Sequence, residues 1–236
     1  MRLVYGVHPV LEVLRRRAPE VKAVLLARRG EAGVAALAAE RGVPVQSASP
    51  LELDELCGST SHQGVAAVVG EYAYAELEDM LAAPGPALLV VLDSVTDAGN
   101  LGAIIRSALV LGATGVVLPK DRAAPITPAV VRVSAGATEH LPCARVTNLA
   151  RALEQLKQAG LWVMGAVERG GQHPSQADLK GPVALVLGSE QKGIRPLVLR
   201  GCDVTLTIPS RSPMAALNVA AAATALLYEA ARQRQT

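Results

Sequence analysis

Hydrophobic and polar positions follow two patterns along the chain. Short unbroken runs of aliphatic residues alternate with longer segments in which apolar residues recur every three or four positions. Such runs are typical of strands buried in a parallel sheet, and the longer segments are typical of helices that cover it. From residue 87 onward, strands are expected at 87–92, 115–118, 161–167, 183–187 and 204–208. Helices are expected at 100–111 and 148–159 and in the Ala-rich segment that ends near residue 229. This alternation predicts a parallel α/β domain.

The first seventy residues show the same alternation on a smaller scale. Helices are expected at 7–17, 31–41 and 50–56, and strands at 22–26, 43–45 and 65–69. The alternation favours a small α/β domain with helices packed on a sheet. Residues 71–86, which include Pro84-Gly85-Pro86, have the composition of a linker. The expected organisation is an N-terminal domain at 1–70, a linker at 71–86 and a C-terminal domain at 87–236.

Composition narrows the class of protein. With 50% hydrophobic and 19% charged residues, the sequence is typical of a globular protein. The net charge of +2 is too small to indicate a partner. From residue 87 onward there are 15 Lys/Arg against 10 Asp/Glu, which is compatible with a polyanionic substrate and equally with an ordinary solvated surface. Aromatic residues make up only 2%, so recognition of RNA would depend on Arg, backbone contacts and shape more than on base stacking.

Cysteine usage and the apolar segments predict location. Three widely spaced cysteines without a C-x-x-C pair favour reduced thiols in a cytoplasmic protein and no metal site. The N-terminus lacks the apolar core of a signal peptide. The longest uncharged run, 212–228, is shorter than a membrane span requires. No membrane association is therefore expected.

Polar residues gather in three loops that follow predicted strands. These loops are 93–100, 188–193 and 209–218. Ligands of open parallel α/β sheets bind beyond the carboxyl ends of the strands, so the three loops predict a shared site. Asn218 is expected inside the first turns of the Ala-rich helix, where Asn is unfavourable, which indicates either a polar role in the site or a cap. The glycine fingerprints of dinucleotide-binding and P-loop proteins are absent from the sequence.

The three loops, in order and spacing, resemble the three signature motifs of the SpoU (TrmH-like) RNA 2′-O-methyltransferases of the SPOUT superfamily. The first motif resembles 93–108, the second 185–193 and the third 208–229. The first seventy residues resemble the substrate-binding domain of the branch that modifies guanosine in rRNA. The resemblance implies a trefoil-knotted C-terminal domain, S-adenosylmethionine as cofactor, and a homodimer with the active site at the subunit interface.

The resemblance also implies roles for individual residues. The catalytic residues would be Asn100, Arg106, Glu190 and Asn218. The cofactor would be bound by Leu187, Gly188, Ile208, Met214 and Leu217. RNA would be bound by His8, Glu12, Arg15, His62, Gln63, Arg132 and Ser134. Arg106 is proposed in the family as base or phosphate anchor, and an arginine, which stays protonated, is better suited to hold a phosphate.

For these residues a plain structural role is the alternative. Asn100 would be a helix cap, Arg106 part of a solvated helix face, and Glu190 a first-turn residue favoured by a helix dipole. The sequence also departs from the family pattern, since Ala216 stands where a serine is usual. The expected substrate is a guanosine of large-subunit rRNA, with tRNA as the alternative. A catalytically weak RNA-binding or ribosome-assembly factor, and a small-molecule-binding α/β protein, are the rivals from other classes.

Overall fold

The computed structural model describes residues 1–27, 32–211 and 216–235, and it divides into two compact units. The N-terminal unit comprises Met1–Ala73 and Ile126–His140, and the C-terminal unit comprises Tyr74–Pro125 and Leu141–Thr236. Residues 126–140 thus pack with the N-terminal unit although they lie between segments of the other one. The boundaries expected from the sequence stay a prediction.

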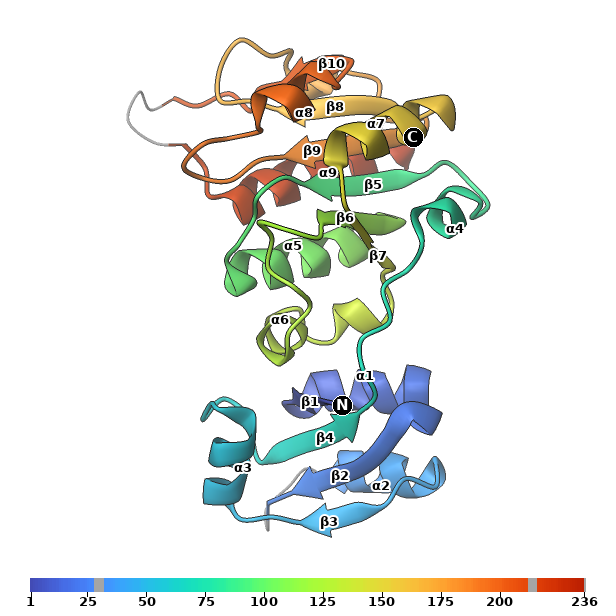
Figure 1. The fold of residues 1–236 in the computed structure, drawn as a ribbon, viewed down its shortest axis with the longest axis vertical. Coiled ribbons are helices and arrows are strands. Elements are labelled where there is room, and N and C mark those ends of the chain that lie inside the picture. The colour runs from blue at the N-terminus through green and yellow to red at the C-terminus, as the bar shows by residue number, and fades with distance from the viewer. Residues whose placement is uncertain (28–31, 212–215, 236) are drawn as a thin grey trace. The chain divides into compact units, whose positions relative to one another are not determined.

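The C-terminal unit is built on a six-stranded sheet in which every pair of neighbouring strands is parallel (Figure 1). Its strand order is β10-β8-β9-β5-β6-β7. The strands are β5 (Leu88–Leu92), β6 (Gly115–Pro119), β7 (Cys143–Val146), β8 (Trp162–Ala166), β9 (Val183–Leu187) and β10 (Val204–Leu206). The expected α/β class with a parallel sheet is confirmed. Strand β7 is not among the expected strands, because its four residues include Arg145 and form no apolar run.

Helices cover both faces of this sheet. Side chains alternate along the strands, so Leu89 and Val91 of β5 face the core under α4 (Leu77–Leu81), α7 (Leu149–Gln158) and α8 (Pro196–Arg200). Figure 1 shows α5 (Ala98–Val110) and α9 (Val219–Arg234) together on the other side of the sheet. Helix α4 lies in the segment expected to be a linker. A short 3₁₀ helix, η3 (Pro174–Gln176), connects β8 to β9.

The starts of α5 and α9 bring polar side chains to the carboxyl edge of the sheet. Asp97 caps α5 by accepting a hydrogen bond from the backbone N of Asn100 at 2.7 Å. Asn218 caps α9, because its Oδ1 accepts from the backbone N of Ala220 at 2.9 Å. Asn218 therefore precedes the Ala-rich helix, and its expected place inside the first turns is wrong. A capping residue satisfies backbone donors that the first turn leaves free.

The end of α9 is anchored by Arg234. Its guanidinium donates to the carbonyl oxygens of Leu179, Pro86 and Ala87 at 2.8, 3.0 and 3.1 Å. Beside it, the buried Gln233 accepts from the backbone N of Leu179 at 3.0 Å. Helix α9 is thereby fixed at both ends, by a cap near the site and by these side chains at the other end.

The N-terminal unit contains a four-stranded sheet of order β1-β4-β2-β3. Strands β1 (Arg2–Tyr5) and β2 (Val21–Leu26) are antiparallel to β4 (Val65–Val69), and β3 (Val45–Ser47) is parallel to β2. The helices of this unit are α1 (Val7–Arg17), η1 (Ala18–Glu20), α2 (Ala32–Glu40), α3 (Pro50–Cys57), α6 (Pro128–Val133) and η2 (Ala137–Glu139). Strand β1 is not among the expected strands, and β3 begins two residues later than expected.

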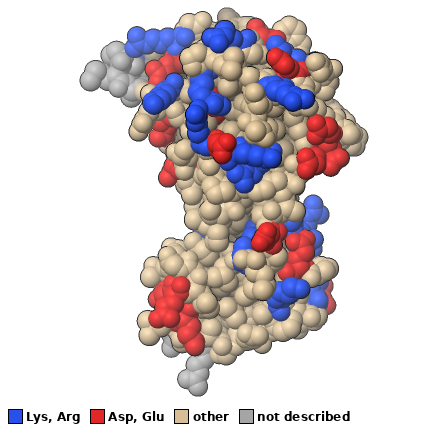
Figure 2. Space-filling view, viewed as in Figure 1, with Lys and Arg blue, Asp and Glu red and all other residues tan. Residues whose placement is uncertain are grey.

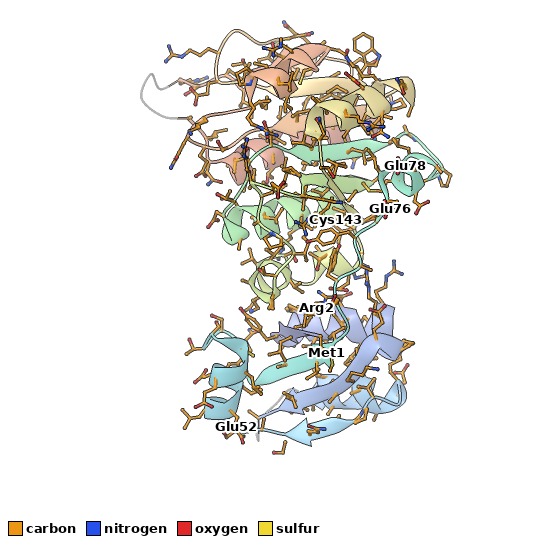
Figure 3. All side chains as sticks on the ribbon, in the orientation of Figure 1. Met1, Arg2, Glu52, Glu76, Glu78 and Cys143 are labelled. Carbon is orange, nitrogen blue, oxygen red and sulfur yellow. The ribbon has the colours of Figure 1, made fainter. Side chains whose placement is uncertain are left out.

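A buried ion cluster fixes residues 137–139 within the N-terminal unit. The fully buried carboxylate of Glu139 accepts from Arg2, labelled in Figure 3, at 2.9 Å and forms an ion pair with the Nε of Arg17 at 3.2 Å. The guanidinium groups of Arg2 and Arg17 lie 5.2 and 5.7 Å from the centroid of the Tyr72 ring. A buried carboxylate is tolerated only when it is paired and hydrogen-bonded, and here two cations supply that pairing.

Candidate active site

A cavity of about 750 Å³ lies at the carboxyl ends of β8, β9 and β10. Four of the five residues expected to bind a cofactor line it, namely Leu187, Gly188, Ile208 and Leu217. The fifth, Met214, lies outside the described residues. The volume falls in the range of small-molecule and cofactor sites. The position agrees with the rule that parallel sheets bind ligands beyond their carboxyl ends.

One wall of this cavity was not predicted from the sequence. Ala166, the last residue of β8, and residues 167–169 after it line this wall and add the charged side chains of Glu168 and Arg169. A strand is expected from the sequence at 161–167, and its carboxyl end could have indicated that a fourth loop borders the site. The loop contains Gly170 and Gly171 but no Asn, and its two charged residues alone are typical of a solvated turn.

The loop after β9 approaches its own backbone closely at Gly188. A Cβ atom at this position would lie 2.0 Å from the carbonyl carbon of Gly193, far inside any real contact distance. The loop is closed by two backbone hydrogen bonds between Ser189 and Gly193, of 3.2 and 2.8 Å. Gly193 also has a φ of 62°, in the left-handed region that favours glycine. Both glycines are therefore required for the shape of this loop.

Three of the four expected catalytic residues meet at the mouth of the cavity. The side-chain N of Asn100 donates to Glu190 Oε1 at 3.2 Å, and the side-chain N of Asn218 donates to Asn100 Oδ1 at 2.9 Å. The same Nδ2 of Asn218 also donates to Glu190 Oε1. The three residues come from the first turn of α5, the loop after β9 and the N-cap of α9, and the contacts span 28 to 118 positions in the sequence. We call this group the amide–carboxylate cluster.

The structure bears on the alternative roles of these three residues. The Oδ1 of Asn218 caps α9, while its Nδ2 donates to Glu190, so capping is confirmed and a role in the site stays a prediction. Asn100 lies in the first turn of α5, where Asp97 is the cap. Glu190 lies in a turn between Ser189 and Gly193 and not in a helix, so the expected helix-dipole alternative is wrong.

An ion pair with a buried carboxylate holds the base of the loop after β9. Asp93, fully buried at the end of β5, accepts from the backbone N of Arg195 at 2.8 Å and from its Nε at 2.7 Å. The backbone N of Asp93 in turn donates to the carbonyl of Leu187 at 2.7 Å. The start and the end of this loop are thereby tied to the same residue of the neighbouring strand.

A second, smaller pocket of about 210 Å³ adjoins the cluster. It is lined by Ser94, Val95, Thr96 and Asp97 from the loop after β5, and by residues 189–192 from the loop after β9. Asn100 and Glu190 line it as well. Because Glu190 lines both pockets, a group held in one can face a group held in the other across the cluster.

Arg106 does not join the cluster. It is exposed on α5, six residues after Asn100, which places it about 9 Å along the helix axis and about 120° around it. Its guanidinium forms no ion pair with an acidic side chain in the part of the chain that the structure describes. A cation held free on the surface is available to bind an anion.

Two of the residues expected to bind RNA are buried and bonded within the chain. The Nδ1 atom of His62 accepts from the backbone N of Gly64 at 2.9 Å, so its Nε2 carries the proton and donates to Asp54 at 2.9 Å. The hydroxyl of Ser134 donates to the carbonyl of Val131 at 3.0 Å. These contacts shape the turn at 62–64 and the end of α6. A contact of either residue with RNA stays a prediction.

The other expected RNA-binding residues lie in the same N-terminal unit. His8 is exposed, the Oε1 of Gln63 accepts from the backbone N of Val7 at 3.2 Å, and Arg132 donates to the carbonyl of Ser61 at 3.1 Å. Gln63 and Arg132 thus connect the 61–64 turn to the start of α1 and to α6. Their role toward RNA also stays a prediction.

Glu12 and Arg15 lie on α1 and form an ion pair. Partial burial acts to raise the pKa of Glu12, but hydrogen bonds from His140 and Arg15 outweigh it and hold that pKa below its ordinary value. Glu12 is therefore a carboxylate at neutral pH, and its negative charge is offset by its neighbours. It can orient Arg15 toward a phosphate more readily than it can contact one itself.

Two absences can be stated for the described part of the chain. No helix there combines the length and apolar character needed to cross a bilayer. Within residues 1–27, 32–211 and 216–235, no three His, Cys, Asp or Glu side chains are grouped so that they could hold a metal ion.

A parallel α/β domain with a ligand cavity at the carboxyl ends of its strands, and an amide–carboxylate cluster at the mouth of that cavity, defines a class of cofactor-binding enzyme domain. Comparison with known families then specifies the class. Residues 87–228 match the SpoU rRNA Methylase family, and residues 3–75 match the RNA 2′-O ribose methyltransferase substrate-binding family. The chain belongs to the SpoU rRNA methylase family.

Individual relatives agree with this assignment. The chain is 42% identical to the 23S rRNA (guanosine-2′-O-)-methyltransferase RlmB of Pseudomonas putida, over 98% of this chain and 96% of that protein. Among solved structures, it resembles the SpoU methyltransferase AviRb from Streptomyces viridochromogenes in complex with AdoMet, with a TM-score of 0.85, 32% identity and coverage of 99% of this chain and 90% of that one. The A. aeolicus TrmH/SpoU tRNA modifying enzyme matches with a TM-score of 0.58 and 26% identity, over 67% of this chain and 81% of that one.

Proposed function

We propose that this protein is an S-adenosylmethionine-dependent methyltransferase that modifies the ribose 2′-hydroxyl of a guanosine in 23S rRNA. The observation that carries the proposal is the amide–carboxylate cluster of Asn100, Glu190 and Asn218 at the mouth of the large cavity. The identity to a protein named as a 23S rRNA guanosine methyltransferase, over nearly the whole of both chains, supports the choice of substrate.

The residues of the cavity fit S-adenosylmethionine. Leu187, Leu206 and Ile208 provide apolar wall. The charged residues of the lining are Glu168, Glu190, Arg169 and Lys192, two of each sign, which suits a ligand that carries both a cationic and an anionic group. The close approach at Gly188 leaves the backbone of the loop after β9 open to a ligand. When bound, this cofactor supplies an electrophilic methyl group on a sulfonium.

The residues of the chain then have distinct tasks toward the RNA. The amide groups of Asn100 and Asn218 hold the Glu190 carboxylate in place, so that it remains an acceptor with a fixed position beside the acceptor hydroxyl. Arg106 binds a phosphate of the RNA backbone with its fork of donors. Because Arg106 stays protonated, it anchors the substrate and does not remove the proton.

We further propose a homodimer in which each active site is completed by the partner. Two observations support it. Arg106 is separated from the cluster of its own chain, and the exposed face of α5 and α9 carries small or uncharged side chains around it. These are Ala103, Ser107, Val110, Ala221, Thr224 and Tyr228, with Val110 and Tyr228 76% and 61% exposed. An exposed helix face with such a composition is typical of a subunit interface.

Three further features belong to the same proposal. The C-terminal unit is proposed to contain a trefoil knot, supported by the convergence of residues 188–193 with Ile208, Ser210, Ala216 and Leu217 on one cavity. The protein is proposed to act in the cytoplasm, where rRNA is modified and thiols stay reduced. The N-terminal unit is proposed to bind RNA. The A. aeolicus tRNA-modifying neighbour matches only 67% of the chain, which favours rRNA over tRNA.

Transfer of radiolabelled methyl groups from S-adenosylmethionine tests the function. Wild type is incubated with 23S rRNA, 16S rRNA and tRNA, and the site is mapped by resistance of the modified linkage to alkaline hydrolysis. Label is expected in 23S rRNA, and Arg106→Ala is expected to lower kcat/KM about 100-fold, as loss of a charge-assisted phosphate contact implies. Label in tRNA alone would overturn the choice of substrate.

A catalytically weak RNA-binding factor is the second candidate, and Ala216 favours it. Ala216 lines the large cavity at a position where a serine hydroxyl would face the site. Comparison of wild type with Ala216→Ser separates the two candidates. Turnover by wild type within a factor of about ten of the variant supports the enzyme, since one hydroxyl contact is worth about 1 kcal/mol. Turnover by Ala216→Ser alone, with equal RNA affinity of both proteins, would support the binding factor.

A further inference from the structure

A basic loop follows β6 at the carboxyl edge of the C-terminal sheet. It carries Lys120 and Arg122, both exposed, with Asp121 between them, and neither cation is in an ion pair with a described acidic side chain. Arg145, at the end of the neighbouring strand β7, adds a third positive charge. Three cations against one carboxylate give this group a net charge of +2. Figure 2 shows Lys and Arg side chains on the visible face of this unit.

This loop is held in a defined conformation. Arg145 donates to the carbonyl of Lys120 at 2.7 Å, and its guanidinium lies 5.0 Å from the centroid of the Tyr74 ring. The backbone N of Lys120 donates to the carbonyl of Val146 at 2.8 Å. Arg122 has a φ of 61°, a left-handed conformation that a residue with a long side chain rarely adopts. The surrounding bonds maintain a backbone that the residues alone would not prefer.

The same loop is directly connected to the candidate active site. The backbone N of Ala124 donates to the carbonyl of Val95 at 3.0 Å, and Val95 lines the smaller pocket beside Asn100 and Glu190. Because β5 and β6 are adjacent parallel strands, the loops that follow them lie side by side at one edge of the sheet. A strand that places one nucleotide at the cluster would therefore continue past Lys120 and Arg122.

We infer that Lys120 and Arg122 bind the phosphodiester backbone of the RNA strand that flanks the acceptor nucleotide, with Arg145 adding to the field. The inference rests on the proposed function, which places RNA at the cluster. Two long cationic side chains with no acidic partner suit phosphates, because phosphate contacts need charge and reach and no match to a particular base. The contact would position the strand without reading its sequence. The scarcity of aromatic residues, 2% of the chain, is in keeping with recognition through the backbone.

The test compares two double variants that each remove two positive charges. Lys120→Ala/Arg122→Gln alters the proposed contact. Lys180→Ala/Arg200→Gln is the matched control, because Lys180 and Arg200 are exposed and lie before β9 and β10, at the opposite edge of the sheet. Methyl-transfer kinetics on 23S rRNA fragments give KM and kcat separately. RNA affinity is measured between about 50 and 300 mM salt, a range over which phosphate contacts weaken measurably, and thermal unfolding checks that both variants fold.

For Lys120→Ala/Arg122→Gln, we expect KM for RNA to rise about tenfold with kcat unchanged, and the salt dependence of log K to weaken by about 1.4 for two phosphate contacts on a single strand. The control double variant should keep the wild-type values. If the wild type is active and both double variants have the same KM and the same salt slope, this inference is overturned and the proposed function stands. A wild type that transfers no methyl group but binds RNA with the expected slopes would overturn the proposed function and leave the contact standing. Loss of affinity for an acidic protein with unchanged RNA affinity would assign the surface to a protein partner and overturn the inference.

Discussion

Asp93 and Arg195, 102 positions apart in the sequence, form a hydrogen-bonded pair in which one buried carboxylate accepts from both the backbone N and the Nε of the arginine. The pair joins the end of β5 to the end of the loop that carries Glu190. Because residues of that loop line both pockets, the pair sets the position of the walls of both. Asp93 itself lines neither pocket. We therefore expect it to act as a positioning residue.

The substitution Asp93→Asn tests this role. The amide that replaces the carboxylate can accept only one of the two hydrogen bonds and cannot balance the charge of Arg195. We expect the free energy of unfolding to fall by about 2 kcal/mol, as for removal of a buried charged acceptor. The dissociation constant of S-adenosylmethionine should rise at least about tenfold. Calorimetric titration and urea unfolding measure the two effects, with Asp178→Asn, an exposed position, as the control. Unchanged cofactor affinity with lowered stability would reduce Asp93 to a structural residue.

The closed shape of the loop after β9 depends on Gly188. Gly188→Ala would place a methyl group 2.0 Å from the backbone of Gly193, so the loop must open. Cofactor binding should fall below detection while the strands of the sheet persist. Gly181→Ala is the matched control, because a Cβ there meets no atom within 4 Å. Calorimetric titration with S-adenosylmethionine separates the two variants. Wild-type affinity in Gly188→Ala would show that the loop does not bind the cofactor.

The two roles of Asn218 can be separated by three substitutions. Asn218→Asp keeps an oxygen that caps α9 but places a second carboxylate against Glu190. Asn218→Ser also caps and brings no charge, whereas Asn218→Ala removes cap and donor together. We expect Asn218→Ala alone to lose about 1 kcal/mol of stability, the usual contribution of a cap. All three should lower kcat, and Asn218→Asp most of all, because it repels Glu190. Equal kcat in Asn218→Ser and wild type would leave Asn218 with the capping role only.

Sequence pattern predicted three loops of the candidate site because each of them follows a recognisable strand. The apolar runs before residues 93, 188 and 209 predicted parallel strands, and their carboxyl ends predicted the meeting of Asn100, Glu190 and Asn218. The residue type also helped, since an Asn beside an Ala-rich helix had no evident role in packing. Capping and catalysis were treated as alternatives, and the two ends of one amide group allow both.

Other features depend on contacts that no local pattern encodes. The Asp93–Arg195 pair joins residues 102 positions apart, and either side chain alone is typical of a solvated loop. Strand β7 was missed because it is short and contains Arg145. Residues 126–140 pack with the N-terminal unit through the buried Glu139, whose partners Arg2 and Arg17 lie more than 100 positions earlier. Such pairings become visible only when the chain is folded.

A mixed dimer would test whether Arg106 acts on the partner's site. Arg106→Ala and Asn218→Ala are each expected to have much lower activity than wild type. When they are unfolded and refolded together, half of the dimers should contain one of each chain, and one of the two sites in these dimers has both residues intact. About a quarter of wild-type activity should return if Arg106 acts in trans. The control mixes Asn100→Ala with Asn218→Ala. Both residues belong to the cluster of one chain, so each cluster in the mixed dimer contains one substitution and no activity should return. No recovery in the first mixture would place Arg106 in the site of its own chain.

The thiol of Cys202 provides a prediction on pH. Burial raises the pKa of Cys202 to about 11 from an ordinary value of 9.0, and the neighbouring Asp203 carboxylate adds to the rise. The folded state therefore disfavours the thiolate relative to the unfolded chain. The resulting contribution to stability is complete below about pH 9 and is lost as the pH rises toward 11. Urea unfolding of wild type and Cys202→Ala from about pH 7 to 10.5 should give stability curves that converge at the alkaline end, and at about pH 8 the folded thiol should react with a disulfide reagent much more slowly than the unfolded one. A constant difference between the curves, together with rapid labelling of the folded protein, would contradict the raised pKa.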